Sequence, residues 1–319
     1  MPKMRFSLLS LIFSLIFSLS FFSGCASSPP LEERAAPTAH EASEVDQGGE
    51  REEDRGSAFL YRIDGGERPS YLLGTIHLGV SFYESLLEDE LRAIASSRVV
   101  YTELSGDLDL AAIAAYFFLG EDEELAPLIG SERFELLAKR TPDLGAEYLS
   151  RLKPWAALVF AGVDEYQRYV RSIGGDPAVS MDAELQAFAR GQAIPNHGLE
   201  TPEEQLGAFD AISIKEVIAL IDELLEKRTF EEADELLRAY RSGEQAALIE
   251  ALDMDASRER APAYYEQLLR IRNHRWLETL KPELKEGGLM IGVGAAHLFY
   301  EDGLIKLFEG AGYQVVKVR

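Results

Sequence analysis

The sequence predicts an α/β fold with a central mixed sheet built from N- and C-terminal segments, flanking helices and a helical middle insertion. Strand-like apolar runs occur near both ends of the folded region, at 59–104 and at 288–318. Within the first group, the order strand–helix–strand is typical of parallel strands that a crossover joins. Between the groups, residues 201–280 are rich in Glu, Leu and Ala and contain little glycine, which favours helices.

The N-terminal group predicts a hairpin followed by a crossover. Residues 59–63 predict a strand, and Asp64-Gly65-Gly66 predicts a tight turn. We therefore expect 71–76 to pair back as the second strand. An apolar stripe over 84–97, with charged side chains on the opposite face, predicts a helix. The third strand is expected at 98–104.

The middle of the chain is expected to be helical with one short strand. Pro154 suits the first turn of a helix over 154–166, because its missing N–H costs little there. Thr201 is expected to cap a later helix, with Glu204 as its capping-box partner. A short strand is predicted at 193–199. The remaining helices expected before residue 192 cover 110–119, 133–139 and 182–190.

The C-terminal group adds two more strands. Residues 288–294 predict a buried strand, and 313–318 predict the last strand. Between them we expect a helix over 302–310, with Asp302 as its cap. The sheet is therefore expected to combine strands from both ends of the chain.

The first 24 residues are predicted to be a secretory signal. Lys3 and Arg5 give a basic start, and residues 6–22 are almost wholly apolar. The segment that ends at Cys25 resembles a bacterial lipobox, so we expect Cys25 to be lipidated and to tether the protein to a membrane. The residue after Cys25 is Ala26 rather than aspartate, which indicates the outer membrane of a Gram-negative bacterium. A plain signal peptide or an uncleaved anchor, with an incidental cysteine, is the alternative.

The rest of the chain divides into a tether and one domain. Residues 25–56 carry prolines, small residues and an acidic cluster, which predicts a disordered tether after the lipidated cysteine. The domain is expected to cover 57–319. The formal net charge of −23 repels nucleic acid and anionic lipid headgroups, so no nucleic-acid partner is expected. The sequence does not indicate an oligomeric state.

Three polar side chains follow predicted strands. His77 and His297 each end a Gly-x-x-His motif, and Glu103 ends the third strand. The carboxyl ends of strands are where open α/β sheets bind ligands. Two imidazoles and one carboxylate can hold a divalent metal ion, which lowers the pKa of a coordinated water toward about 7 and favours hydrolysis. A hydrogen-bonded structural role for each histidine is the alternative.

Other chemistries have less support. There is no Gly-x-Ser-x-Gly elbow, no phosphate-binding glycine loop, and the single cysteine belongs to the signal. Glu103 is alternatively a general base that accepts a proton from water.

Four further polar residues are candidates for the site. Asp182 and Glu200 are expected to be additional ligands or groups that orient the histidines. Glu200 is equally suited to cap the helix after Thr201. Arg272 is expected to anchor substrate or to stabilise an oxyanion, with a structural salt bridge as the alternative. Asn273 is expected to support the surroundings of Arg272.

Several motifs together resemble the TraB/GumN family. They are Gly74-Thr75-Ile76-His77, Glu103, Lys153-Pro154-Trp155, Leu199 to Gln205, Arg272-Asn273, and Val293 to Leu298 with Glu301 to Leu304. The resemblance implies an α/β fold shared with erythromycin esterase and ChaN-type haem-uptake proteins. It also implies a peptidase-like site for a divalent ion (manganese, cobalt or zinc), with His77, Glu103 and His297 as ligands and a peptide or protein as substrate. A non-catalytic ligand- or haem-binding envelope lipoprotein is the alternative function.

Overall fold

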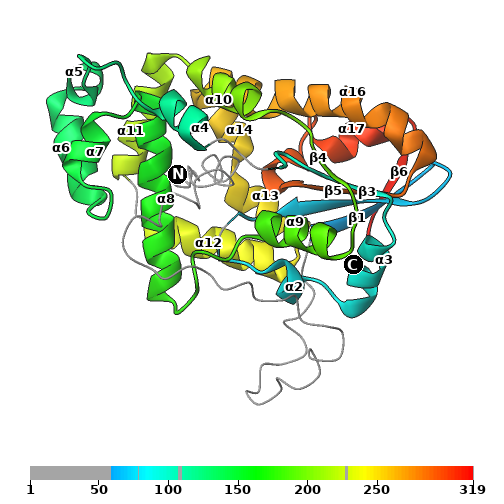
Figure 1. Cartoon of the computed structure of the whole chain (residues 1–319). Coiled ribbons are helices and arrows are strands. Elements are labelled where there is room, and N and C mark those ends of the chain that lie inside the picture. Colours follow the sequence, from blue (N-terminus) through cyan, green and yellow to red (C-terminus); the bar gives the residue numbers. More distant parts are fainter. Residues whose placement is uncertain (1–58, 78, 107–109, 227–228, 319) are drawn as a thin grey trace, which may run out of the picture.

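The computed structural model describes residues 59–77, 79–106, 110–226 and 229–318. The predicted signal, Cys25 and nearly all of the tether lie outside these residues. The strands are β1 (Phe59–Asp64), β2 (Ser70–Thr75), β3 (Val99–Thr102), β4 (Asn196–Gly198), β5 (Leu289–Gly294) and β6 (Gln314–Lys317). They form one sheet in the order β4-β3-β5-β2-β1-β6 (Figure 1).

The sheet is mixed and joins the two ends of the chain. Strands β4, β3, β5 and β2 are parallel neighbours, whereas β1 runs antiparallel to both β2 and β6. The C-terminal strand β5 lies between the N-terminal strands β2 and β3, with Gly74 opposite Val293 and Thr75 opposite Gly294. The predicted fold class is therefore confirmed, and β5 places the two Gly-x-x-His motifs on adjacent strands.

Helices make up most of the remaining chain. Before β4 they are α2 (Phe82–Ser85), α3 (Glu88–Ala95), α4 (Leu110–Phe117), α5 (Leu125–Ile129), α6 (Ser131–Arg140), α7 (Ala146–Ser150), α8 (Pro154–Ser172) and α9 (Met181–Gly191). After β4 they are α10 (Pro202–Asp210), α11 (Ile214–Glu226), α12 (Thr229–Ser242), α13 (Gln245–Leu252), α14 (Met254–Arg260), α15 (Pro262–Tyr265), the π-helical turn η5 (Glu266–Arg270), α16 (Ile271–Glu286), the 3₁₀ turn η6 (Ala295–His297) and α17 (Leu304–Gly310).

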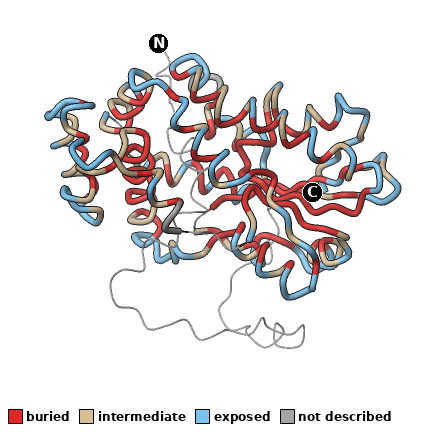
Figure 2. The backbone as a smooth tube through the Cα atoms, turned by 45° about the horizontal axis from the view of Figure 1, so that its top comes forward, coloured by how far each residue is buried: buried red, intermediate tan, exposed pale blue. Residues whose placement is uncertain are grey.

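These helices cover the sheet in layers. Helices α16 and α17 lie over one face of the sheet and α9 lies over the other, while α4 to α8 and α10 to α13 pack beyond one end of it (Figure 1). The central strands are almost wholly buried, and the outer helices expose one side to solvent (Figure 2). No helix in the described part of the chain is both long enough and apolar enough to cross a membrane.

Two predicted elements have different bounds. The single helix expected over 84–97 is two helices, because Leu86 is extended between them. Ser81 caps the first of them, and the Glu90 carboxylate accepts the backbone N–H of Leu87 at the start of the second. Each helix thus has its own N-terminal cap, and the extended Leu86 interrupts the helix although the apolar stripe continues. The strand expected at 193–199 is shorter and covers only Asn196–Gly198.

The two predicted caps have different outcomes. Thr201 and Glu204 form the expected capping box at the start of α10. The cap expected at Asp302 is wrong, because Gly303 is the N-cap of α17 and makes no side-chain cap bond. The Asp302 carboxylate instead pairs with the exposed His274, with His274 Nε2 3.1 Å from Asp302 Oδ1. A side chain from α16 thus takes the place of the local backbone donor.

Candidate functional site

The two histidines and the glutamate meet at one edge of the sheet. His77 follows β2, Glu103 follows β3 and His297 ends the turn η6 that follows β5. Because these three strands are parallel neighbours, their carboxyl ends bring the side chains together. All three are buried, with exposed fractions of 1%, 4% and 0%. The structure thus assembles one site from segments that are far apart in the chain.

The two Gly-x-x-His motifs interlock through their glycines. A methyl group on Gly74 would lie 2.8 Å from Leu298 Cδ2 and 3.2 Å from Ala295 Cα, both in the turn that carries the second histidine. A methyl group on Gly294 would lie 3.1 Å from His77 Nε2 and 3.3 Å from Glu103 Oε1. Because neither glycine has a side chain, the two motifs can pack closely against each other at both positions.

Asp182 fixes the orientation of His77. The Asp182 Oδ2 atom lies 2.6 Å from His77 Nδ1, and Thr75 Oγ1 donates to Asp182 Oδ1 at 2.8 Å. A carboxylate on Nδ1 leaves the other ring nitrogen to face the site. His77 Nε2 is buried and has no hydrogen-bond partner in the described structure. A buried polar atom of this kind points to a missing partner.

Asn273 performs the same task for His297. Its side-chain oxygen Oδ1 lies 2.6 Å from His297 Nδ1, so the ring carries its proton on Nδ1 and donates to the amide. The His297 Nε2 atom then accepts from Arg272 Nη1 at 3.2 Å, and it lies 3.8 Å from Glu103 Oε1. The ring of Trp276 packs on the imidazole at a centroid distance of 4.5 Å. Asn273 therefore supports the histidine rather than the arginine.

Arg272 is the centre of the charged network. Its Nη2 donates to Glu103 Oε2 at 2.6 Å and also to Glu200, while Nε donates to Glu200 at 3.0 Å. Its Nη1 donates to the Leu268 carbonyl at 2.9 Å. Glu200 also accepts from Arg275, and its carboxylate contacts neither histidine and caps no helix. The contacts of Glu200 are thus those of a buried salt bridge that holds Arg272.

The buried charges shift the pKa values in opposite directions. Burial alone would lower the pKa of His77, but the charge and hydrogen bond of Asp182 outweigh it and raise the value. Burial raises the pKa of Glu103 although Arg272 opposes the shift. Burial, with the Arg272 and His77 charges, lowers the pKa of His297 well below its usual range. The neutral imidazole is therefore favoured at His297, whereas Asp182 favours the protonated form of His77.

The neutral state of His297 predicts a loss of stability in acid. The unfolded chain titrates this histidine near pH 6.5, and below that pH it binds a proton that the folded protein does not. The His297→Gln variant has no imidazole at this position and so lacks this pH-dependent contribution to stability. His77 and Glu103 are present in both the native protein and the variant, so the comparison isolates His297. Between pH 7.5 and pH 5, the stability advantage of the native protein over the variant should fall by about 2 kcal/mol in urea unfolding. An advantage that stays constant or grows toward pH 5 would contradict a depressed His297 pKa.

The side chains provide ligand atoms of the right chemistry for a cation, with one obstacle. His77 Nε2 and Glu103 Oε1 face the same point beside Gly294, and His297 Nε2 lies close to Glu103. As these side chains lie, no group of three or more His, Cys, Asp or Glu residues within the described ranges is arranged to hold a metal ion. The obstacle is that two of these ligands already have hydrogen-bond partners. Arg272 Nη1 donates to His297 Nε2, while the Gly294 N–H and Arg272 Nη2 donate to the two oxygens of Glu103. The chemical types of the donor atoms, imidazole nitrogen and carboxylate oxygen, are those that bind divalent ions in proteins.

Three further residues contact the site and were not expected from the sequence. Gln205 Nε2 donates to both Glu103 and Glu200, at 3.3 and 3.2 Å. The Tyr240 hydroxyl donates to the Gly74 carbonyl at 2.7 Å, and Trp276 packs on both His297 and Arg272. Gln205 could have been found, since it ends the Leu199–Gln205 motif. Tyr240 and Trp276 have no such local signal, because helices α12 and α16 bring them to the site.

The comparison with protein families gives one match. The model of the TraB/PrgY/gumN family matches residues 59–317, which include all the site residues described above. No curated protein and no solved structure matches the chain.

Proposed function

The chain belongs to the TraB/PrgY/gumN family, and from this premise we propose that it is a metal-dependent hydrolase that cleaves peptides. The proposal rests on the imidazole of His77. Its Nε2 atom is buried, has no hydrogen-bond partner among the described residues, and faces the point beside Gly294 that Glu103 Oε1 also faces. A histidine that a carboxylate orients in this way is typical of metal ligands in proteins.

In this proposal His77, Glu103 and His297 hold a divalent ion such as manganese, cobalt or zinc. Asp182 and Asn273 set the two imidazole orientations from behind. When bound, the ion would supply a Lewis acid that lowers the pKa of water near it. Because His77 has a raised pKa, a cation at Nε2 competes with a proton, and its affinity should rise with pH.

Arg272 supplies a fixed positive charge beside this position. Glu200 holds two of its nitrogens, so the guanidinium stays oriented even after Nη1 releases His297. A positive group held in a buried site stabilises negative charge that develops on a carbonyl oxygen of the substrate. Glu103 serves as a ligand, or as the group that accepts a proton from water.

Metal content tests the proposed ligands directly. Full-length protein is expected to bind about one divalent ion per chain, and a chelator should stop its cleavage of a peptide library. The His77→Ala/His297→Ala variant should lose both the ion and the cleavage. The matched control replaces the two exposed histidines, in His197→Ala/His274→Ala, and should keep both. Unchanged metal content in the first variant would reject these ligands.

The same protein samples test the second candidate function, haem binding without catalysis. The unpartnered His77 Nε2 is also suited to face an iron atom. A Soret band on adding haem, with no cleavage of any peptide, would favour this function over hydrolysis.

We further propose that the domain is exported and held on the outer membrane by lipid at Cys25. The basic, apolar start and the cysteine at its end support this location. The mass of the mature N-terminal peptide tests it, since an unmodified cysteine there would exclude lipidation.

A further inference from the structure

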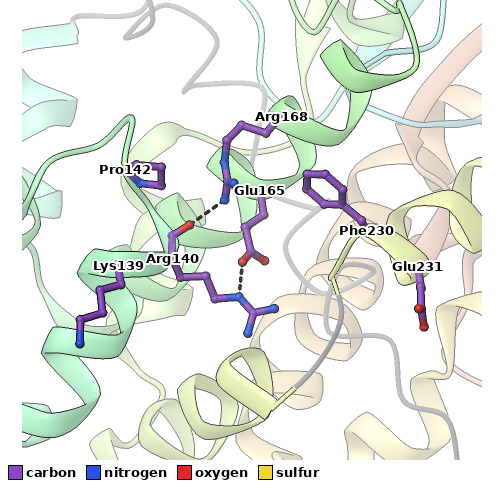
Figure 3. Close-up of a pocket in the computed structure, with 7 residues that line it drawn as sticks. All are labelled: Lys139, Arg140, Pro142, Glu165, Arg168, Phe230 and Glu231. Carbon is purple, nitrogen blue, oxygen red and sulfur yellow. Dashed lines mark hydrogen bonds and ion pairs between the residues drawn. The ribbon is translucent and has the colours of Figure 1, made fainter.

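Away from the candidate site, a hollow lies between α6, α8 and the start of α12 (Figure 3). Its volume is about 400 Å³, and it is lined by Lys139, Arg140, Pro142, Glu165, Arg168, Phe230 and Glu231. Helix α12 runs from this hollow to the site at the sheet. Phe230 lies ten residues before Tyr240, which corresponds to roughly 15 Å along a helix. Since the Tyr240 hydroxyl reaches Gly74, the hollow is separate from the candidate metal site.

Glu165 carries an unused acceptor in this hollow. Its side chain is only 4% exposed, and Arg140 forms an ion pair with its Oε1 atom. The other oxygen, Oε2, is buried and has no partner in the described structure. In Figure 3 this oxygen points away from Arg140, toward the side where Phe230 lies. A buried carboxylate oxygen without a donor is costly, so a ligand that donates to it is favoured.

Arg168 carries an unused donor on the same helix. Its Nε pairs with Asp164 at 2.9 Å, and its Nη2 donates to the Arg140 carbonyl at 2.6 Å. Its Nη1 makes no hydrogen bond or ion pair with the described residues, and the guanidinium carbon lies 5.9 Å from the centroid of the Phe230 ring. A guanidinium N–H is suited to a carboxylate of a ligand.

The charges around the hollow balance. Lys139, Arg140 and Arg168 are cationic, and Glu165, Glu231 and the Asp164 partner of Arg168 are anionic. A ligand with a large net charge of either sign would upset this balance, whereas a zwitterion would not. The rim supplies apolar contact, because the Phe230 side chain is 42% exposed and Pro142 lies opposite it in Figure 3.

We propose that this hollow binds a small zwitterion, an α-amino acid with an apolar side chain. Its ammonium donates to Glu165 Oε2, its carboxylate accepts from Arg168, and its side chain packs on Phe230. The volume lies within the range of small-molecule sites, which is about 300–1,000 Å³. This site is independent of the proposed hydrolase, so either can fail without the other.

L-leucine and two derivatives test the two charged contacts separately. In calorimetric titrations of the full-length protein, L-leucine should bind saturably. N-acetyl-L-leucine lacks the ammonium and L-leucinamide lacks the carboxylate, so each should bind at least about tenfold more weakly. Equal binding of L-leucinamide would show a cation site, and equal binding of N-acetyl-L-leucine an anion site. Either result, or no binding of L-leucine at millimolar concentration, would overturn the proposal.

Variants place the binding in this hollow. Glu165→Gln should weaken L-leucine binding about tenfold or more, whereas Glu135→Gln, an exposed change on α6, should have no effect. Because Glu165→Gln removes the partner of Arg140, its folding needs a check by thermal unfolding. Phe230→Ala changes an exposed ring without that risk and should also weaken binding severalfold. Full affinity in Phe230→Ala would exclude this hollow as the site.

Discussion

Arg272→Met is expected to lower the free energy of unfolding by about 3–5 kcal/mol. The change removes the only cation that contacts both Glu103 and Glu200 among the described residues, and both carboxylates stay buried. Methionine keeps much of the volume and the packing on Trp276, so the loss comes from charge rather than from a cavity. Urea unfolding of the variant and the native protein at pH 7.5 measures the difference.

Two further variants separate this loss of stability from the effect of removing a positive charge elsewhere. Arg270, two residues before Arg272, forms a partly exposed ion pair with Glu266, and Arg270→Met should cost less than about 1 kcal/mol. Adding Glu103→Gln and Glu200→Gln to Arg272→Met should restore part of the stability, because no unpaired charge then remains buried. A cost below 1 kcal/mol for Arg272→Met alone would show that water enters the network and that the charges are not desolvated.

The position of Arg272 depends on a local irregularity of its helix. The π-helical turn η5, Glu266–Arg270, comes immediately before α16, and Arg272 Nη1 donates to the Leu268 carbonyl within that turn. Single π turns inside helices are frequent at functional sites because they redirect side chains and free a carbonyl group. The irregularity thus helps to hold the guanidinium between Glu103 and His297.

The sequence predicted a mixed sheet from both ends of the chain and placed the two histidines after strands, but it could not establish that they meet. Each strand has its own apolar run, and a polar residue after a parallel strand has only one edge of the sheet to occupy. It was insufficient for the split between α2 and α3, where Leu86 is extended and the Glu90 carboxylate caps a new helix within a continuous apolar stripe. Local hydrogen bonds that involve single side chains leave little trace in a periodic pattern.

The network around the site was harder to predict than its centre. Asp182 and Asn273 were candidates, but only the packing of α9 and α16 shows which histidine each supports. The hydrogen bond from Arg272 to His297 could not be foreseen, because it depends on the direction of a long side chain from a distant helix. In the proposed metal site, this contact and the hydrogen bonds to Glu103 from Arg272 and Gly294 would have to give way to a cation.

Gly294→Ala is expected to weaken metal binding and peptide cleavage by about 100-fold, a loss similar to that of a supporting ligand contact. The added methyl group would lie 3.1 Å from His77 Nε2 and 3.3 Å from Glu103 Oε1, in the space that a cation needs. Gly294 has φ −50° and ψ 136°, which alanine adopts without strain. The fold should therefore survive with a cost of about 1–3 kcal/mol for the crowded contact. Metal titration and chelator-sensitive cleavage measure the first effect, and urea unfolding measures the second.

Gly207→Ala is the matched control for this change. Gly207 lies within α10, and a methyl group there would meet nothing within 4 Å. Alanine in a helix is favoured over glycine, so this variant should be more stable by about 0.5–1 kcal/mol and should bind metal normally. If Gly294→Ala also bound metal and cleaved peptide at the native level, no cation would lie between His77 and Glu103. The two interlocked glycines would then serve only the packing of one motif against the other.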